Sequence, residues 1–152
     1  MRNKLKYVVV DDDPFIINMV EDLCQNSPHA VIVQSFKDPR KFLEAAPYLE
    51  FDGCFLDICM PKMDGILVAG KLLDKQVIFV TGASDKLKDA IESDPVDILL
   101  KPINKDRFYK ALAKAYNLNN LMQVNGARHK TAMKEYALFN VAESKEKVRL
   151  CL

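Results

Sequence analysis

Three consecutive aspartates, Asp11, Asp12 and Asp13, directly follow the apolar run of residues 7–10. Such a run is typical of a strand buried on both faces, as strands are in a parallel sheet covered by helices. Ligands bind such sheets at the carboxyl edge, where these acids would lie. Adjacent carboxylates repel one another unless a proton or a cation compensates their charge, and their oxygens suit Mg²⁺ or Ca²⁺. Asp13 before Pro14 also indicates a helix N-terminus, which leaves Asp11 and Asp12 unexplained.

Three further polar side chains lie at the ends of other short apolar runs. Asp57 and Thr81 each end such a run, and Lys101 directly follows one. If these runs are parallel strands, the three side chains share one sheet edge with Asp11 and Asp12. Each has a structural explanation when taken alone, such as a helix cap for Thr81 or a solvated charge for Lys101. Their coincidence at one edge indicates a functional site.

This set of side chains suits the transfer of a phosphoryl group onto a carboxylate. Asp57 is the expected nucleophile, because carboxylates form aspartyl phosphates. A divalent cation held by Asp11, Asp12 and Asp57 would neutralise the acids and the incoming phosphoryl oxygens, and Lys101 would add a fixed positive charge. Thr81 would donate its hydroxyl to a phosphoryl oxygen after transfer. Since this chemistry depends on positioning and electrostatics, a small site is sufficient.

The elements that must position these side chains alternate regularly along the chain. Apolar, β-branched runs predict five strands, and amphipathic segments predict a helix after each of them. Such alternation is typical of parallel strands joined by right-handed crossovers. We therefore expect an α/β fold with a flavodoxin-like, doubly wound, five-stranded parallel sheet of order 2-1-3-4-5 and helices on both faces. The expected strands are residues 7–10, 30–36, 51–57, 77–81 and 97–100, and the expected helices are residues 14–26, 38–46, 66–73, 85–93 and 105–117.

Composition and motifs exclude several other classes of protein. The chain has 152 residues, of which 49% are hydrophobic and 28% charged, and its formal charge of +1 gives no global argument for nucleic acid or membrane partners. It shows neither a bilayer-spanning apolar run nor a signal-peptide pattern, so we expect a cytoplasmic location and no membrane partner. The nucleotide-binding patterns GxxxxGKS/T and GxGxxG are absent. Cys24 and Cys54 are expected to be buried small hydrophobic residues.

Four segments together resemble the response regulator receiver domain of two-component signalling. They are residues 9–14 (VVDDDP), 55–65 (FLDICMPKMDG), 80–83 (VTGA) and 100–102 (LKP). The resemblance covers about residues 4–118.

This resemblance implies that a histidine kinase or a phosphotransfer protein phosphorylates Asp57 and thereby switches an output. It also implies that Asp12, Asp57 and the backbone carbonyl of Cys59 ligate Mg²⁺. In this interpretation the chain is a phospho-acceptor that promotes only its own phosphorylation and dephosphorylation, and it is not an enzyme. The residues that match the family's acidic pair, phospho-acceptor, hydroxyl and lysine are Asp11 and Asp12, Asp57, Thr81 and Lys101.

Two features of the sequence bear on output and on the lifetime of the phosphorylated form. Many receivers have an aromatic residue three positions before the lysine, where this chain has Ile98, a β-branched residue with no ring to swing. We therefore expect the output to depend on Thr81 and on displacement of residues 82–86. In the receiver family that this chain resembles, the positions two residues after the phospho-acceptor and two residues after the hydroxyl influence attack by water. They hold Cys59 and Ala83, which orient water poorly, so we expect the phosphorylated form to last for minutes or longer.

The C-terminal part, residues 119–152, is expected to be an extension, a linker or a partial output-domain segment after a receiver domain of residues 1–118. Residues 137–142 and 147–151 suggest a strand pair, which resembles the opening strands of a LytTR-type DNA-binding domain cut short. An extra helix or a loose tail is the alternative. DNA is expected as a partner only if an output domain is present elsewhere. Receivers often dimerise through the surface of the fourth helix, the fifth strand and the fifth helix. The resemblance therefore implies that a homodimer would form through the corresponding surface here, about Asp85 to Asn117.

Two other classes of protein remain open. A hydrolase of the haloacid dehalogenase type also has a nucleophilic aspartate after its first strand, and here Asp11 would be the nucleophile and Asp13 the acid/base. Against this, Pro14 interrupts the usual continuation and Asp57 would have no role. A pseudo-receiver would only bind a partner, but a protein-binding scaffold has no use for three clustered carboxylates.

Overall fold

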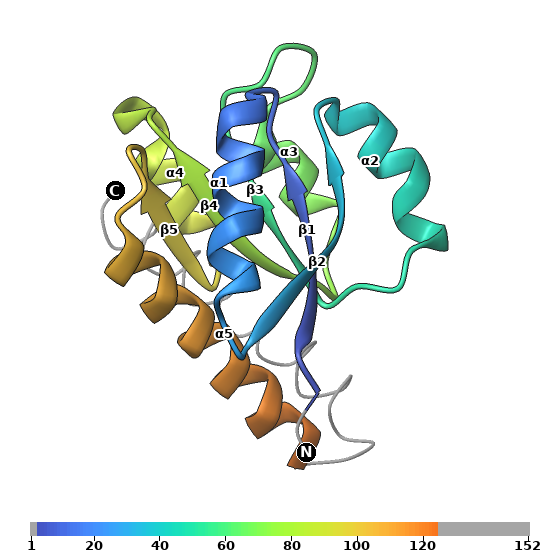
Figure 1. Ribbon diagram of the computed structural model, residues 1–152. Coiled ribbons are helices and arrows are strands. Elements are labelled where there is room, and N and C mark those ends of the chain that lie inside the picture. The colour runs from blue at the N-terminus through green and yellow to red at the C-terminus, as the bar shows by residue number, and fades with distance from the viewer. Residues whose placement is uncertain (1–2, 125–152) are drawn as a thin grey trace, which may run out of the picture. The chain divides into compact units, whose positions relative to one another are not determined.

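A five-stranded parallel sheet forms the centre of the computed structural model, which describes residues 3–124. The strand order is β2-β1-β3-β4-β5, as the sequence predicts. Figure 1 shows α1 and α5 on one face of the sheet and α2, α3 and α4 on the other. The elements are β1 (Leu5–Val10), α1 (Pro14–Gln25), β2 (Ala30–Phe36), α2 (Pro39–Ala45), the 3-10 helix η1 (Ala46–Tyr48), β3 (Gly53–Leu56), α3 (Gly65–Gly70), β4 (Gln76–Thr81), the 3-10 helix η2 (Ser84–Lys86), α4 (Leu87–Glu92), β5 (Asp97–Leu100) and α5 (Lys105–Val124).

Two apolar layers, one on each face of the sheet, bury the side chains of the central strands. In β1, Tyr7 and Val9 belong to the layer under α1 and α5, whereas Val8 and Val10 belong to the layer under α2, α3 and α4. Successive side chains of a strand point to opposite faces, so a strand between two apolar layers is apolar at every position. The unbroken apolar run before the aspartates has this origin. The expected burial of Cys24 and Cys54 is confirmed, at 1% and 0% exposure.

Three aspartates begin the helices that follow β1, β2 and β3. Asp13, Asp38 and Asp64 have extended backbones and act as N-caps of α1, α2 and α3. The cap satisfies a backbone donor that has no partner within the helix, and it fixes the loop between strand and helix. In each case Oδ1 accepts a hydrogen bond from the N–H two residues later: Phe15 at 2.9 Å, Arg40 at 2.9 Å and Ile66 at 2.7 Å.

Several ends of elements differ from the expectations. The helix expected to end near Asn117 continues to Val124, because asparagine weakens a helix only slightly and no glycine or proline interrupts this one. The third helix ends at Gly70 instead of Leu73. The helix expected over residues 85–93 begins as the 3-10 turn η2 and becomes α-helical only from Leu87 to Glu92. The third strand is limited to Gly53–Leu56, shorter than the expected residues 51–57.

The domain boundary predicted after residue 118 falls inside α5 and remains a prediction. The strand pair predicted over residues 137–142 and 147–151 lies outside the described residues. Within residues 3–124, no helix has the length and apolarity needed to cross a membrane.

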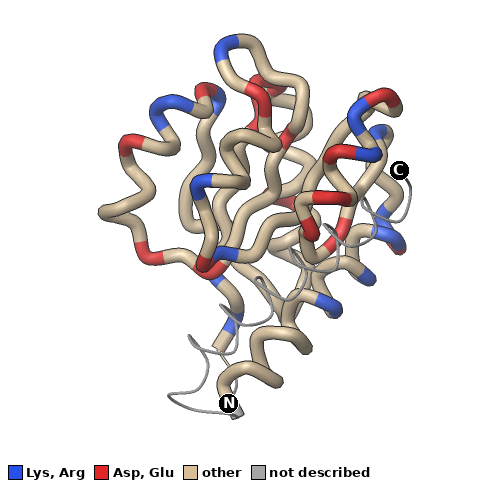
Figure 2. Tube along the Cα trace, turned by 180° about the vertical axis from the view of Figure 1, so that it is seen from behind, with Lys and Arg blue, Asp and Glu red and all other residues tan. Residues whose placement is uncertain are grey.

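Charged side chains are distributed unevenly over the two helices that flank β5. Figure 2 shows lysine and arginine residues spaced along α5. The residues of η2 and α4 carry three exposed acids but also two lysines, Lys86 and Lys88, so their formal charge is only −1. Helix α5 carries four basic residues and one exposed acid, Asp106, so its formal charge is +3. The exposed basic residues of α5 are Lys105, Arg107, Lys110 and Lys114, and the exposed acidic residues of η2 and α4 are Asp85, Asp89 and Glu92.

Candidate functional site

The predicted site residues lie together at the carboxyl edge of the sheet. Asp11 directly follows β1, Asp57 follows β3, Thr81 is the last residue of β4, and Lys101 follows β5. Strand β3 pairs in parallel with both β1 and β4, and β4 pairs in parallel with β5, so the C-terminal ends of these strands meet at one edge. Four separate parts of the sequence thus supply one cluster of side chains.

Three carboxylates and one ammonium group form the centre of this cluster. Asp11, Asp12 and Asp57 each offer an oxygen, and these oxygens all lie within 4.8 Å of one another. Lys101 Nζ lies 3.0 Å from Asp11 Oδ2 and 3.5 Å from Asp57 Oδ2. Asp11 and Asp57 are buried, whereas Asp12 is exposed. Among the described residues, Lys101 is the one cation paired with this cluster of three acids, so the ionised cluster has excess negative charge.

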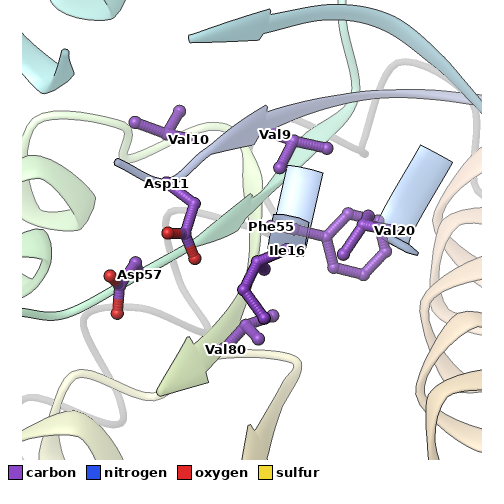
Figure 3. Close-up of a pocket in the computed structure, with 8 residues that line it drawn as sticks. All are labelled: Val9, Val10, Asp11, Ile16, Val20, Phe55, Asp57 and Val80. Carbon is purple, nitrogen blue, oxygen red and sulfur yellow. The ribbon is translucent and has the colours of Figure 1, made fainter. Parts of the chain in front are cut away.

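Apolar side chains adjoin Asp11 and Asp57 and change their ionisation. Burial raises the pKa of Asp57 to about 6; the charges of Asp11 and Asp12 also raise it, and Lys101 opposes them. Burial likewise raises the pKa of Asp11, although the Asp13 N–H and Lys101 act in the opposite direction. Burial lowers the pKa of Lys101, but its contacts with Asp11 and Asp57 outweigh burial and raise it overall. Figure 3 shows the pocket around the two acids, lined by Val9, Val10, Ile16, Val20, Phe55 and Val80.

The Asp11 carboxylate has one oxygen held by the backbone and one left for a cation. Oδ1 accepts a hydrogen bond of 2.9 Å from the N–H of Asp13. Oδ2 is buried and, among the described residues, it has the ion pair with Lys101 but no hydrogen bond of good geometry. A buried, charged oxygen in this state favours a cation, and hard carboxylate oxygens suit Mg²⁺. The donor set of Asp11, Asp12 and Asp57 therefore fits a divalent cation.

Thr81 is fully buried and is held by the turn that follows it. Its Oγ1 accepts a hydrogen bond of 3.1 Å from the N–H of Ala83, and its carbonyl oxygen accepts one of 2.9 Å from the N–H of Lys101. The bond from Ala83 uses a lone pair of the hydroxyl oxygen and not its proton. The hydroxyl of Thr81 can thus still donate to another oxygen.

The loop of residues 58–64 leaves β3 at Asp57 and returns closely against it. The N–H of Gly65 donates to the carbonyl of Ile58 at 2.8 Å. A Cβ atom at Gly65 would overlap the carbonyl oxygen of Asp57, so only glycine permits this approach. Cys59, expected to provide its backbone carbonyl, lies in this loop with an exposed side chain. Gly65 is therefore essential for the position of the Asp57 backbone.

A comparison with protein families gives a direct match. The family described as "Response regulator receiver domain" matches residues 7–113. The chain belongs to this family. The fold and the predicted class of function, a receiver domain of two-component response regulators, are thereby confirmed.

Individual relatives agree with this assignment of a receiver domain. An uncharacterized response regulatory protein of Vibrio cholerae is 35% identical over 112 residues, which are 70% of this chain and 43% of that protein. The chemotaxis protein CheY of Listeria monocytogenes is 31% identical over 120 residues, 73% of this chain and 98% of CheY. The crystal structure of the response regulatory domain of mrkE from Klebsiella pneumoniae covers 75% of this chain and 97% of its own, with a TM-score of 0.71 and 26% identity. This chain therefore spans less than half of its Vibrio relative but nearly all of CheY.

Sequence reasoning missed the contacts that hold the loops of this receiver domain. Lys62 Nζ lies 3.0 Å from Asp38 Oδ2, and Lys86 Nζ lies 3.3 Å from Asp64 Oδ2. In the sequence, the caps of α1 and α2 are marked by Asp-Pro pairs. No local pattern indicates which lysine reaches which cap, because the partners are 24 and 22 residues apart.

Proposed function

We propose that the receiver domain accepts a phosphoryl group on Asp57 from a histidine kinase or a phosphotransfer protein, in the presence of Mg²⁺. The observation that carries this proposal is the position of the buried Asp57 carboxylate, grouped with Asp11 and Asp12 and 3.5 Å from Lys101. An Asp57 oxygen would attack the phosphorus of a phosphohistidine, the P–N bond would break, and the histidine ring would leave. Phosphorylation would then switch the binding of a partner or of a DNA-binding output.

Each residue of the cluster has a distinct role in this proposal. Asp11, Asp12, Asp57 and the carbonyl of Cys59 would hold Mg²⁺, which when bound neutralises charge on the phosphoryl oxygens. Lys101 keeps its proton and supplies fixed positive charge beside the acceptor. Thr81 retains a free hydroxyl proton with which to hold a phosphoryl oxygen after transfer.

The ionisation of Asp57 agrees with its role as nucleophile. Only the carboxylate form attacks phosphorus, and a pKa of about 6 leaves Asp57 mostly ionised at neutral pH. The same burial that raises this pKa keeps the nucleophile poorly hydrated and therefore reactive.

The hydrolase alternative has less support. Its acid/base would be Asp13, whose Oδ1 is engaged as the N-cap of α1 at 2.9 Å. Its nucleophile would be Asp11, which is tied to Lys101 and to the backbone at Asp13. It also gives no role to Asp57.

Intact-protein mass spectrometry tests the proposed function. The chain is incubated with acetyl phosphate and Mg²⁺ and compared with Asp57→Asn and with a sample containing excess EDTA. We expect one phosphoryl addition, absent from the variant and from the EDTA sample. No addition to the native chain, with normal folding, would favour a pseudo-receiver. Phosphate release that survives Asp57→Asn but not Asp11→Asn would favour the hydrolase.

The wider setting of the domain is part of the same proposal. We place it in the cytoplasm, as a signalling domain whose only reactions are its own phosphorylation and dephosphorylation. The receiver would be followed after residue 118 by an extension, a linker or part of an output domain. The chain spans 43% of its Vibrio relative, and DNA would be a partner only through an output domain elsewhere.

A further inference from the structure

The loop of residues 58–64, which carries Cys59, is tied to the start of α2 by an ion pair. Lys62, near the tip of the loop, places Nζ 3.0 Å from Oδ2 of Asp38. The side chain of Asp38 is only 16% exposed, whereas that of Lys62 is 50% exposed. Asp38 belongs to the loop between β2 and α2, so the pair joins two loops at the carboxyl edge of the sheet.

Asp38 is held rigidly enough to serve as a fixed anchor. Its Oδ1 accepts a hydrogen bond of 2.9 Å from the N–H of Arg40, and the Arg40 Nε lies 3.6 Å from the same oxygen. The Arg40 N–H and then Lys62 lower the pKa of Asp38 to about 2, so it remains charged near neutral pH. One oxygen therefore caps α2 while the other receives the lysine.

The backbone at Lys62 supports a specific role for its side chain. Lys62 has φ of 74°, in the left-handed region that a lysine adopts at a cost and that glycine or asparagine adopts readily. The loop thus keeps a long cationic side chain at a position where its backbone favours other residues. The side chain extends from the loop to Asp38. This contact with another loop stabilises the backbone conformation at Lys62.

From these contacts we infer that Lys62 is a positioning residue for the divalent cation: its ion pair with Asp38 holds the loop that carries Cys59 in the shape that binds Mg²⁺. The inference rests on the proposed function, because it concerns the same Mg²⁺ site. The loop is anchored at its base by Gly65 against Asp57 and by the ion pair of Asp64 with Lys86, and Lys62 anchors its tip. Without the anchor at the tip, the loop would adopt other conformations, and Mg²⁺ binding would have to order it again at a cost in affinity.

Net charge alone and the positioning role predict opposite effects of removing Lys62 on the affinity for Mg²⁺, so the test can distinguish them. Removing a lysine makes the net charge of the domain more negative and should tighten Mg²⁺ binding. The positioning role predicts weaker binding after the same change. Lys41, an exposed lysine of α2, serves as the matched control for loss of charge.

Mg²⁺ titration of the full chain, followed by amide chemical shifts, measures the affinity without any phosphorylation. For Lys62→Gln we expect a Kd for Mg²⁺ about threefold higher, the size expected when an exposed ion pair is lost. Lys62→Arg retains the charge and should restore the native Kd. Lys41→Gln should leave the Kd unchanged or lower it. A Lys62→Gln chain with a Kd equal to or below the native one would overturn the inference, even if its melting temperature falls.

A double variant distinguishes the effect of the ion pair between Lys62 and Asp38 from the separate effects of their two charges on Mg²⁺ binding. Asp38→Asn keeps an N-cap residue but removes the partner charge of Lys62. If the pair acts as a unit, Lys62→Gln with Asp38→Asn should bind Mg²⁺ no more weakly than the weaker single variant. A Kd that returns to the native value in the double variant would indicate opposing charge effects and would contradict the positioning role.

The two proposals fail in different ways in this experiment. If the native chain binds no Mg²⁺ and accepts no phosphoryl group from acetyl phosphate, the proposed function is wrong and the inference falls with it. If the native chain does both, and half-maximal phosphorylation of Lys62→Gln needs the native concentration of Mg²⁺, only the inference is wrong. The expected result is a shifted Mg²⁺ requirement with a nearly native rate at saturating Mg²⁺.

Discussion

The Asp57 carboxyl combines two properties that oppose each other in the folded chain. It is 4% exposed and lies beside Asp11, so ionisation is unfavourable there, and burial is the main reason that its pKa is about 6. Phosphoryl transfer needs the ionised form. If Asp57 is the phospho-acceptor, as proposed, the folded chain keeps its nucleophile at the expense of some stability, a common feature of functional sites.

Replacing Asp57 by asparagine should reveal this cost as a function of pH. The folded-state pKa lies above the ordinary value of 3.8, so the folded state favours the protonated form. The stabilising contribution of that proton is complete at low pH and is lost as the pH rises through about 6. We therefore expect Asp57→Asn to melt at a higher temperature than the native chain at pH 8, and the difference to shrink towards pH 5. Thermal unfolding in EDTA, followed by circular dichroism, would measure this difference in melting temperature. Asp12→Asn serves as the control for loss of an exposed charge. A difference that does not depend on pH would contradict the raised pKa of Asp57.

If Asp57 is phosphorylated as proposed, we expect Cys59 to influence how long the phosphorylated form persists. Its thiol is exposed two residues after Asp57, and it is a weak hydrogen-bonding group for orienting water. We expect the purified phosphorylated chain to persist for minutes or longer and Cys59→Asn to shorten this time severalfold, because an amide can orient an attacking water. The decay of the phosphorylated mass after removal of acetyl phosphate measures the lifetime. Cys59→Ala should remain long-lived, and loss of the native phosphoryl group within seconds would refute the prediction.

At the scale of elements, the segment after β4 is the expected moving part. Ile98 packs against the core layer under α2, α3 and α4 and has no ring to exchange between two positions. The turn of residues 82–86 follows Thr81 directly and is tied to the loop after β3 by Lys86 and Asp64, 3.3 Å apart. Movement of this turn towards a phosphoryl group would strain or break that ion pair.

Weakening the Lys86 ion pair should therefore favour the phosphorylated state. Lys86 is partly exposed, so the pair contributes little energy, and we expect Lys86→Gln to increase the phosphorylated fraction about twofold at limiting acetyl phosphate. Lys88→Gln, which removes an exposed lysine of α4, should have no such effect. Hydrogen exchange with a beryllofluoride mimic provides the structural check. Unchanged exchange over residues 82–86 would show that this turn is not the moving part.

The sequence predicts the helix starts that local residues determine, but it does not predict the helix end and the contact that depend on the rest of the fold. The Asp13-Pro14 and Asp38-Pro39 pairs indicate their helices because cap and proline act within a single turn. The end of α5 was missed because asparagine residues near 117 only weaken a helix, and nothing local ends it. Site residues followed from strand ends, but the contact between Lys62 and Asp38 depends on how two loops approach in space. Local patterns in the amino-acid sequence do not indicate how these two loops pack against each other.

At the scale of the whole molecule, a network of uncharged hydrogen bonds and the cluster of charged side chains lie at opposite edges of the sheet. Near the amino edge, the Tyr7 hydroxyl donates to Gln76 Oε1 at 2.6 Å, and Gln76 Nε2 donates to the carbonyl of Ala115 at 2.9 Å. These bonds connect β1, β4 and α5 far from the acids. The carboxyl edge instead holds three acids and one lysine, an excess of negative charge. A change of charge at this edge can therefore alter the loops around it while the apolar core stays packed.

The surface of residues 85–117 should be the dimer interface of the receiver domain. It carries three exposed acids on η2 and α4 and four exposed basic residues on α5, so two copies related by a two-fold axis can pair opposite charges. Ile91 in α4 and Leu100 in β5 are 65% and 54% exposed and provide apolar area for the contact. We expect sedimentation velocity to show more dimer with beryllofluoride than without, and less dimer at high salt because screening weakens charge pairs. Ile91→Arg should abolish the dimer, whereas Leu67→Arg, at an equally exposed leucine of α3 (64%), should not; equal effects of the two variants would place the interface elsewhere.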